Sequence, residues 1–429
     1  MTAVPAIPNS RVVVLFLVML IAAAGNTAMQ SALPAIASQL DMPDVWVSLA
    51  FSWSALLWVI TAPKWARMSD RRGRKALMSL GVVGFIASMG LCGLVLWLGL
   101  EGMIGPVLTF SLFALFRSLY GGFGSAAPPA VQAYVAARTE RAERAKALSL
   151  LASSFGVGTV IGPAVAHYLL FPPFGLAGPL IMFALFGVAV LVALHWHLPN
   201  DTPRFAARGA VAAYPNSASM NAPESDEIDD GALPREEVRL KWRDERLAVW
   251  LTAGLIGGHA QAILLGVVGF LVRDRLGLQD QPLQAVQASG SVMLIGAMAT
   301  LLAQWGLIPI LSLAPRSSVL LGSVLALVGV VLTGISYDFY GISTGFAIAS
   351  LGFGLFRPGF TAGASLAVRR HEQGDVAGKI ASINGAAYIF APAVGVALFA
   401  LWEPATFALT ALALLFLIVW SRKALSVPA

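Results

Sequence analysis

The sequence is poor in charged residues and in cysteine for a chain of this length. Only 12% of its 429 residues are charged and 58% are hydrophobic, which excludes an ordinary soluble domain. The one cysteine, Cys92, cannot form an intramolecular disulfide, and its apolar surroundings predict a buried thiol. A GxxxxGKS/T nucleotide-binding loop and a metal-ligand cluster are both absent, so we expect no ATP-driven pumping, no metal and no cofactor. The sequence also lacks a nucleophile, base and acid constellation, and it therefore does not predict an enzyme.

Long apolar segments make up most of the chain. A membrane-spanning helix needs about 20 mostly apolar residues, and the sequence predicts twelve such helices. They cover residues 12–34, 46–66, 76–98, 106–132, 147–170, 178–197, 247–271, 285–310, 317–336, 341–367, 380–401 and 405–421. The first of them resembles a signal peptide, but we interpret it as a span because its helical pattern continues as far as Pro34.

Basic residues fall on one side of these predicted spans. If both termini are cytoplasmic, only Arg273 and Arg275 of the 28 Lys and Arg residues lie in outer segments, and only Arg117 and Arg357 lie within spans. Lys and Arg are enriched in the cytoplasmic loops of membrane proteins. The distribution predicts a multi-pass protein of the cell inner (plasma) membrane with cytoplasmic N- and C-termini. It also accounts for the net charge of +6, so we do not expect nucleic acid as a partner.

A polar stretch separates six predicted helices from the other six. Residues 201–245 are rich in Pro, Ser, Asn and acidic residues, which is typical of a flexible cytoplasmic linker. A shift of 229 residues places GPAVAHYLL, which starts at Gly162, on APAVGVALF, which starts at Ala391. The sequence therefore predicts two six-helix bundles of common plan, residues 1–200 and 246–429.

The segment WARMSDRRGRKALMSLG, residues 65–81, contains a single acid, Asp70, among basic residues that follow the second span. Gly73 permits the positive φ that a tight turn between helices needs. With the twelve spans and the repeat, this segment resembles the major facilitator superfamily of secondary transporters. The loop after the second helix of that family reads Gly, two variable residues, a small residue, Asp-Arg, one variable residue, Gly and two basic residues. Residues 66–75 match this pattern, except that Ala66 replaces the first glycine.

The resemblance implies an all-α integral membrane fold with 12 transmembrane helices in two pseudo-symmetric six-helix bundles. It also implies that Asp70 faces the N-terminal end of the eleventh helix, near Gly378 to Ser382, where backbone N–H groups and the helix dipole favour an anion. Such a contact would join the two halves as a cytoplasmic latch. The candidate gating residues at this latch are Asp70, Gly73, Arg74, Arg138 and Arg141.

Two further motifs carry the resemblance. In the fourth helix, Arg117 and Gly121 match an Arg, three residues, Gly pattern of the family. In the fifth helix, Gly158, Gly162 and Pro163 resemble a signature of drug-efflux antiporters, and they complete the set of candidate gating residues. Small residues allow helices to approach closely, and proline kinks a helix.

The match to that signature is partial. Ser149 stands where the signature opens with Gly, and Ala166 and His167 stand where it ends with Gly-Gly. The chain nevertheless looks closest to the twelve-helix drug/proton antiporters of the tetracycline-exporter kind, although nothing supports tetracycline itself as the solute.

Charged residues are almost absent from the predicted spans. All 22 acidic residues fall in loops or at helix ends, so no carboxylate is placed to carry a proton through the membrane. Arg117 lies about 16 Å into the fourth helix, near the bilayer midplane. His259 is the only histidine at the centre of a span, and because an imidazole can exchange a proton near neutral pH it is the candidate for proton coupling.

The resemblance implies that helices 1, 4, 7 and 10 line a central cavity, and polar pairs four residues apart mark one face of helices 1 and 11. The candidate substrate-binding residues are Asn26, Gln30, Arg117, Tyr120, His259, Gln261, Arg357, Asn384 and Tyr388.

We therefore expect a monomeric secondary active transporter that exports a small organic or drug-like solute against proton entry by alternating access. Its partners are the solute, protons and the lipid bilayer. A proton-coupled importer or exchanger of organic anions remains open, because the spans hold arginines and no carboxylate. A membrane sensor or scaffold that transports nothing is the alternative from another class.

Overall fold

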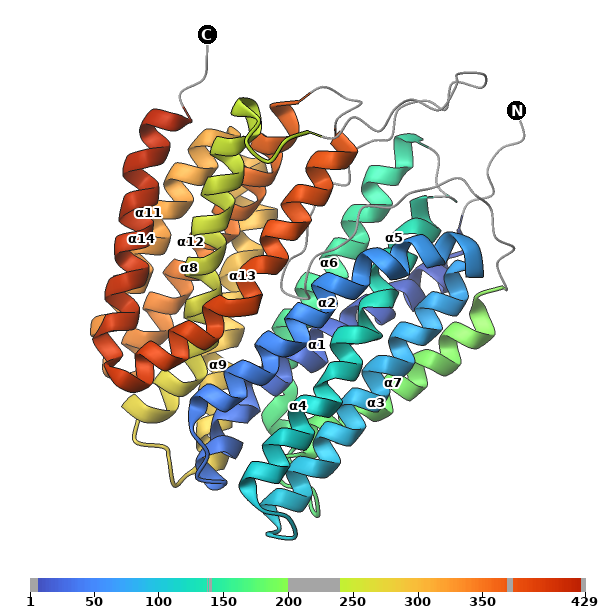
Figure 1. The fold of residues 1–429 in the computed structure, drawn as a ribbon, viewed down its shortest axis with the longest axis vertical. Helices are drawn as coiled ribbons and strands as arrows, with labels where there is room; N and C mark the ends of the chain where they lie inside the picture. Colours follow the sequence, from blue (N-terminus) through green and yellow to red (C-terminus); the bar gives the residue numbers. More distant parts are fainter. Residues whose placement is uncertain (1–6, 137, 139–140, 200–239, 369–372, 426–429) are drawn as a thin grey trace.

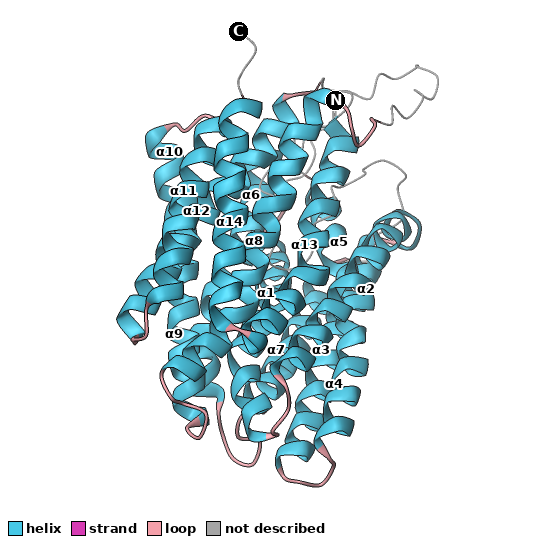
Figure 2. Ribbon diagram, turned by 60° about the vertical axis from the view of Figure 1, so that its left-hand side comes forward, coloured by secondary structure: helices cyan, strands magenta, loops and turns pink. Residues whose placement is uncertain are grey.

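The structure, a computed structural model, describes residues 7–136, 138, 141–199, 240–368 and 373–425, and every regular element in these ranges is a helix (Figure 2). The N-terminal half contains α1 (Asn9–Gln39), α2 (Asp44–Arg72), α3 (Arg74–Leu100), α4 (Pro106–Gly122), α5 (Ala127–Ala136), α6 (Arg141–Ala166) and α7 (Gly178–His197). The C-terminal half contains α8 (Glu245–Arg275), α9 (Pro282–Leu301), α10 (Ile308–Leu311), α11 (Pro315–Ile335), α12 (Phe339–Leu366), α13 (Gln373–Leu401) and α14 (Glu403–Ala424). Short 3₁₀ or π turns cover Gly124–Ala126, His167–Leu169 and Leu302–Leu307.

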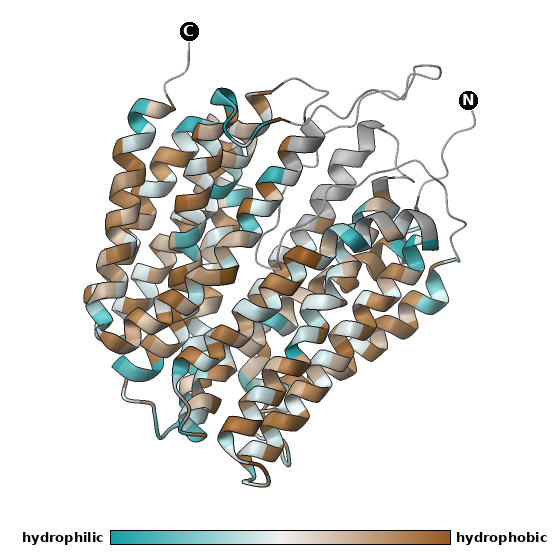
Figure 3. Ribbon diagram, viewed as in Figure 1, coloured by the Kyte–Doolittle hydropathy of each residue, from teal (hydrophilic) through white to brown (hydrophobic). Residues whose placement is uncertain are grey.

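Eleven helical segments of the described chain are long and apolar enough to cross a membrane. Two of them combine shorter elements, since α4 and α5 form Pro106–Val135 and α9 and α10 form Pro282–Leu311. The remaining predicted span, residues 147–170, falls on α6 and the 3₁₀ turn that follows it. Figure 3 shows hydrophobic residues along the lengths of the helices and hydrophilic residues toward their ends. Side chains such as Leu412 and Phe416 on α14 are more than half exposed, as lipid-facing residues would be.

Local sequence determines where several helices begin. Pro106, Pro282 and Pro315 are the first residues of α4, α9 and α11, where a proline has the right φ and no N–H to lose. Asp244 caps α8 by accepting a hydrogen bond from the backbone N–H of Arg246 at 3.1 Å. A hydrogen bond from the Arg246 side chain also lowers the pKa of the Asp244 carboxyl below its usual value.

The helices form two groups that lie side by side, α1–α7 in one and α8–α14 in the other (Figure 1). Between the groups, α2 packs on α13 and α6 packs on α9, while α1 contacts both α8 and α9. Glycines allow these approaches. A Cβ at Gly385 of α13 would lie 2.6 Å from Cγ2 of Val59 on α2, and a Cβ at Gly290 of α9 would lie 2.7 Å from the carbonyl oxygen of Pro163 on α6. The α2–α13 and α6–α9 contacts are the two seams between the groups, and the spaces that remain between the groups lie beside them.

Candidate functional site

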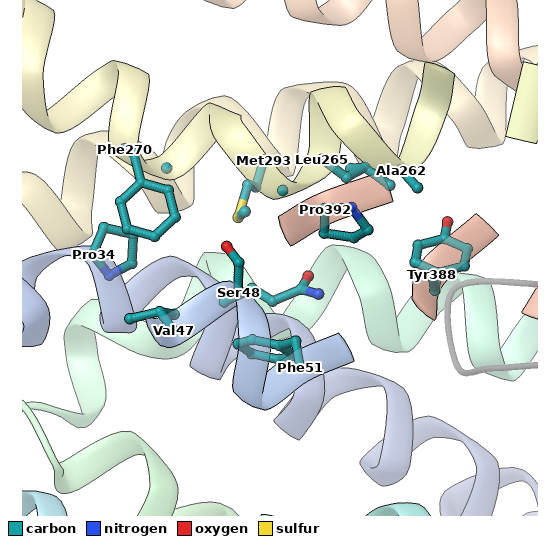
Figure 4. Close-up of a pocket in the computed structure, with 13 residues that line it drawn as sticks. Pro34, Val47, Ser48, Phe51, Ala262, Leu265, Phe270, Met293, Tyr388 and Pro392 are labelled. Atoms are coloured by element: carbon teal, nitrogen blue, oxygen red, sulfur yellow. The ribbon is translucent and has the colours of Figure 1, made fainter. Parts of the chain in front are cut away.

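One cavity lies at the seam between α2 and α13, and we call it the α2–α13 cavity. The space within its lining is about 540 Å³, including the part that is open to solvent. Figure 4 shows side chains from both halves converging on it: Val47, Ser48 and Phe51 from α2 face Ala262 and Leu265 from α8 and Tyr388 and Pro392 from α13. Because both halves supply its walls, a relative movement of the halves would change its shape.

A second cavity lies at the seam between α6 and α9, and we call it the α6–α9 cavity. The space within its lining is about 710 Å³, including the part that is open to solvent. The N-terminal half contributes polar side chains from α1 and α6, namely Thr27, Gln30 and Thr159. The C-terminal half contributes polar and aromatic side chains from α8, α9 and α12, namely Gln261, Thr300, Phe346, Ser350 and Phe353.

Gln30, Leu265 and Met293 line both cavities, so the two spaces adjoin at the centre of the molecule. The internal repeat relates their walls. The shift of 229 residues that places Pro163 on Pro392 also places Thr159 on Tyr388, and the first member of each pair lines the α6–α9 cavity while the second lines the α2–α13 cavity. The two cavities are therefore built from corresponding helices of the two halves.

The described residues that line the two cavities include no Asp, Glu, Lys, Arg or His. Their polar groups are hydroxyls and amides set among Leu, Met, Phe and Pro side chains. Ligand pockets of this kind are mostly apolar, with a few polar groups that fix orientation. A fully ionised group placed here would lose hydration without meeting an opposite charge, so the lining favours a solute whose buried part is uncharged.

Three of the predicted cavity residues instead form a buried cluster within the N-terminal half. Arg117 Nη2 donates a hydrogen bond to Asn26 Oδ1, and the Arg117 guanidinium carbon lies 4.5 Å from the centroid of the Tyr120 ring. Asn26, Arg117 and Tyr120 are all fully buried, and none of them lines either cavity. The guanidinium carbon also lies 5.1 Å from the centroid of the Phe51 ring, which does line the α2–α13 cavity. The cluster is thus separated from that cavity by one side chain.

The other predicted residues divide between the cavities and the helix packing. Tyr388 lines the α2–α13 cavity and Gln261 lines the α6–α9 cavity. Arg357 is buried, lines neither cavity and interacts with the Tyr388 side chain. Asn384 is also buried and lines neither cavity. His259, two residues before Gln261, is half-buried, and its Nδ1 lies 2.7 Å from the carbonyl oxygen of Leu255 in the preceding turn.

The predicted glycines of α6 lie at its contact with α1. A Cβ at Gly158 would lie 2.4 Å from the carbonyl oxygen of Leu20, and a Cβ at Gly162 would lie 2.3 Å from that of Ala24. One turn of α6 therefore touches the backbone of α1 in its own half, while the Pro163 carbonyl touches α9 in the other half. Gly158 and Gly162 therefore pack within the N-terminal half and Pro163 reaches the other half, and a gating role for these residues stays a prediction.

The loop between α2 and α3 has the predicted turn. Gly73 has a φ of 89°, and its N–H donates to the carbonyl oxygen of Ser69 at 3.1 Å. Arg74 and Lys75 are buried, and Lys75 Nζ donates to the carbonyl oxygen of His195 at 3.0 Å. A cation is favoured at the C-terminal end of a helix, here α7. Lys75 therefore ties the start of α3 to the end of α7.

The remaining latch residues are placed only in part. The side chains of Asp70 and Arg141 lie outside the described residues, so the contact between Asp70 and the eleventh helix stays a prediction. That helix, α13, begins at Gln373, which puts Gly378 and Ser382 in its second and third turns rather than at its first. Arg138 has its guanidinium carbon 3.9 Å from the centroid of the Tyr134 ring.

Several cavity residues have no sequence feature that identifies them as cavity residues. Met293, Phe346 and Pro34 are ordinary members of apolar helices, and only the packing of the halves brings them to the cavities. Thr159 is different, because it corresponds to Tyr388 in the internal repeat. That correspondence could have predicted its place in a cavity wall.

Comparison with known proteins agrees with this architecture. The family model of the Major Facilitator Superfamily matches residues 15–392. The multidrug resistance protein MdtG of Dickeya zeae is 30% identical over 128 residues, 29% of this chain and 28% of its own length. The multidrug resistance efflux pump PmrA homolog of Lactococcus lactis is 30% identical over 161 residues, 37% of this chain and 36% of its own. A solved structure of a bacterial homolog of the human lysosomal transporter Spinster, inward-facing and occupied, has a TM-score of 0.72 at 12% identity, covering 98% of this chain and 99% of its own.

The chain belongs to the Major Facilitator Superfamily, and its fold is that of a multi-pass, all-helical membrane transporter. The prediction of family and fold class from the sequence is confirmed, as is the expectation that the chain is not an enzyme. The matched segments span about a third of the length of these curated relatives.

Proposed function

We propose that the protein exports a small organic, drug-like solute from the cell in exchange for protons, by alternating access of the two adjoining cavities. The observation that carries this proposal is the uncharged, largely apolar lining that both halves share around Gln30, Leu265 and Met293. Relatives named as multidrug resistance proteins support export as the direction of transport and drug-like molecules as the class of solute. The proposal includes an inner-membrane location, cytoplasmic termini and a monomeric transporter.

Transport into proteoliposomes tests this function. With an acidic lumen, protons leave through the protein, and an antiporter accumulates the solute inside. The panel should contain uncharged, cationic and anionic amphipathic dyes of similar size, and we expect accumulation of the uncharged dyes to be the strongest. Gln30→Leu should reduce this accumulation about tenfold, since a buried hydrogen bond to a solute is worth about 1 kcal/mol or more. Gln39→Leu, at the exposed end of the same helix, is the matched control. If no dye accumulates with either sign of the proton gradient, the protein is better explained as a sensor or scaffold.

An importer or exchanger of organic anions is the second candidate. Arg357 supports it, because this buried guanidinium contacts the hydroxyl-bearing ring of Tyr388, which itself lines the α2–α13 cavity. An anionic group that displaced Tyr388 would meet a positive charge there. Counterflow of an anionic dye that needs no proton gradient and is lost in Arg357→Gln would favour this function over drug export.

Asp70→Asn should impair transport about tenfold and leave insertion intact, if the Asp70 carboxylate closes the cytoplasmic side against α13. The amide keeps the shape of the side chain and removes the charge that a helix N-terminus attracts. Initial transport rates in proteoliposomes, normalised to the amount of reconstituted protein, measure the effect. Wild-type turnover in this variant would contradict the latch.

His259→Gln should abolish proton-driven accumulation while leaving solute exchange without a gradient, if His259 carries the coupled proton. His197→Gln is a matched control, because the His197 Nδ1 lies 3.0 Å from the carbonyl oxygen of Ala193, the same local geometry that His259 has with Leu255. The measurement is the ratio of accumulation with an acidic lumen to exchange at equal pH. An unchanged ratio in His259→Gln would remove this residue as the proton carrier.

A further inference from the structure

The two halves are joined by charged side chains at one end of the molecule, where α2 begins and α8 ends. Arg273, in the last turn of α8, directs its guanidinium at the first residue of α2, Asp44. Nη1 lies 2.8 Å from Asp44 Oδ1 and Nη2 lies 2.7 Å from Asp44 Oδ2, so the pair is bidentate. Bidentate Arg–carboxylate pairs are the strongest ion pairs in proteins and fix the geometry of both partners.

Further contacts hold this guanidinium in place. Nη1 also donates to the carbonyl oxygen of Pro34 on α1 at 3.0 Å, and Nε donates to Asp274 Oδ1 at 2.6 Å. The side chain of Arg273 is 8% exposed and that of Asp44 is 15% exposed, so water screens the pair little. Arg273 therefore binds two helices of the opposite half from a site that is largely closed to solvent.

Close backbone packing surrounds the ion pair. A Cβ at Gly269 of α8 would lie 2.9 Å from Cγ of Pro34, and Ser38 Oγ of α1 donates to the carbonyl oxygen of Gln279 at 3.2 Å. The α2–α13 cavity lies directly inside this contact, since Pro34, Gly269 and Phe270 are among its lining residues. The ion pair thus lies next to one end of that cavity.

A second arginine on α8 provides a contrast. Arg275, two residues further on, pairs with Glu403 at the start of α14 and donates to the carbonyl oxygen of Gly334 at 2.7 Å. Both partners belong to the C-terminal half. The two arginines have the same chemistry at the same end of the molecule, but only Arg273 reaches across the boundary between the halves.

We propose that Arg273 and Asp44 form a releasable gate that holds the halves together at the end opposite the Asp70 loop, and that its opening is required for the cavities to reach the outer side. The role of this gate rests on the proposed transport function, whereas the experiment that tests the gate does not require transport. Removing the Asp44 carboxylate leaves the Arg273 guanidinium with Asp274, on its own helix, as its charged partner and takes away the ion pair that joins the halves, so the closed arrangement loses stability. The equilibrium then shifts toward the arrangement in which this end is open.

Distance measurements by double electron–electron resonance in lipid nanodiscs test the gate. Spin labels are attached in a Cys92→Ser background at Met103→Cys in the N-terminal half and Tyr340→Cys in the C-terminal half, two exposed positions at this end of the molecule. With Asp44 in place we expect one short distance. Asp44→Asn should add a longer distance and raise the ratio of open to closed populations about thirtyfold, the lower end of the range for truncating a buried charge pair. Asp44→Glu keeps a carboxylate at this position, so it should give the same single short distance as the parent.

Glu403→Gln is the matched control, because it removes a carboxylate from the neighbouring arginine without touching the boundary between the halves. We expect its distance distribution to equal that of the parent. Arg273→Gln serves as the second gate variant if Asp44→Asn does not fold. An unchanged distribution in the folded gate variants, or an equal change in Glu403→Gln, overturns the gate. These results do not depend on finding a solute, so the gate and the proposed export fail separately.

Discussion

Arg117→Ala is expected to abolish transport and to lower the free energy of unfolding by about 3–5 kcal/mol, the range for deleting a large buried side chain. The substitution leaves the Asn26 carbonyl oxygen without its guanidinium donor and removes the cation that lies on the faces of Tyr120 and Phe51. The missing Arg117 side-chain atoms leave a void between α1, α2 and α4. Thermal unfolding in detergent and initial rates in proteoliposomes measure the two effects separately.

A double variant distinguishes packing from chemistry at this cluster. Arg117→Met with Asn26→Leu replaces the polar pair by apolar side chains of similar size, and such replacements of buried polar pairs are often neutral for stability. We expect unfolding close to that of the parent and transport still lost. If transport also returns to the parent rate, the guanidinium serves packing alone and does not belong to the transport site.

Gly162→Ala is expected to reduce transport about tenfold and to lower the free energy of unfolding by about 2–3 kcal/mol. The added methyl group would lie 2.3 Å from both the carbonyl oxygen of Ala24 and the hydroxyl oxygen of Thr27. A backbone atom cannot move aside as a side chain can, so α6 must shift away from α1. Because the next residue, Pro163, contacts α9, the shift reaches the seam between the halves.

Gly122→Ala is the control for this substitution. Gly122 ends α4, and no heavy atom lies within 4 Å of the position that its Cβ would take. We expect its unfolding and transport to match those of the parent or to improve slightly, because alanine favours the helix more than glycine does. Equal losses in both variants would show that helix flexibility, rather than close contact at α6, causes the effect.

The sequence contains most of what determines the fold. Runs of about 20 apolar residues locate the helices, because a chain in lipid must satisfy its backbone polar groups within each helix. The motif around Gly73 and the repeat that relates Pro163 to Pro392 identify the family and its two halves. Hydropathy does not locate the polar ends of helices, and α13 begins at Gln373, seven residues before its predicted span.

The candidate site was harder to predict. A polar residue in a span is equally consistent with a cavity wall and with a hydrogen bond to the next helix. Gln30 is on the wall, whereas Asn26, four residues earlier on the same helix, is bonded to Arg117. Apolar lining residues such as Met293 resemble any core residue, and the pairing of Arg273 with Asp44, 229 positions apart, depends on how the halves dock.

The shared wall at Gln30 has a consequence for how solutes would interfere with one another. Each cavity offers its own apolar surface, yet both present this amide to an occupant. If the proposed export takes place and two dissimilar solutes bind one on either side, inhibition of one by the other would follow mixed rather than purely competitive kinetics. Broad selectivity would then arise from two compartments of different lining rather than from one adaptable compartment.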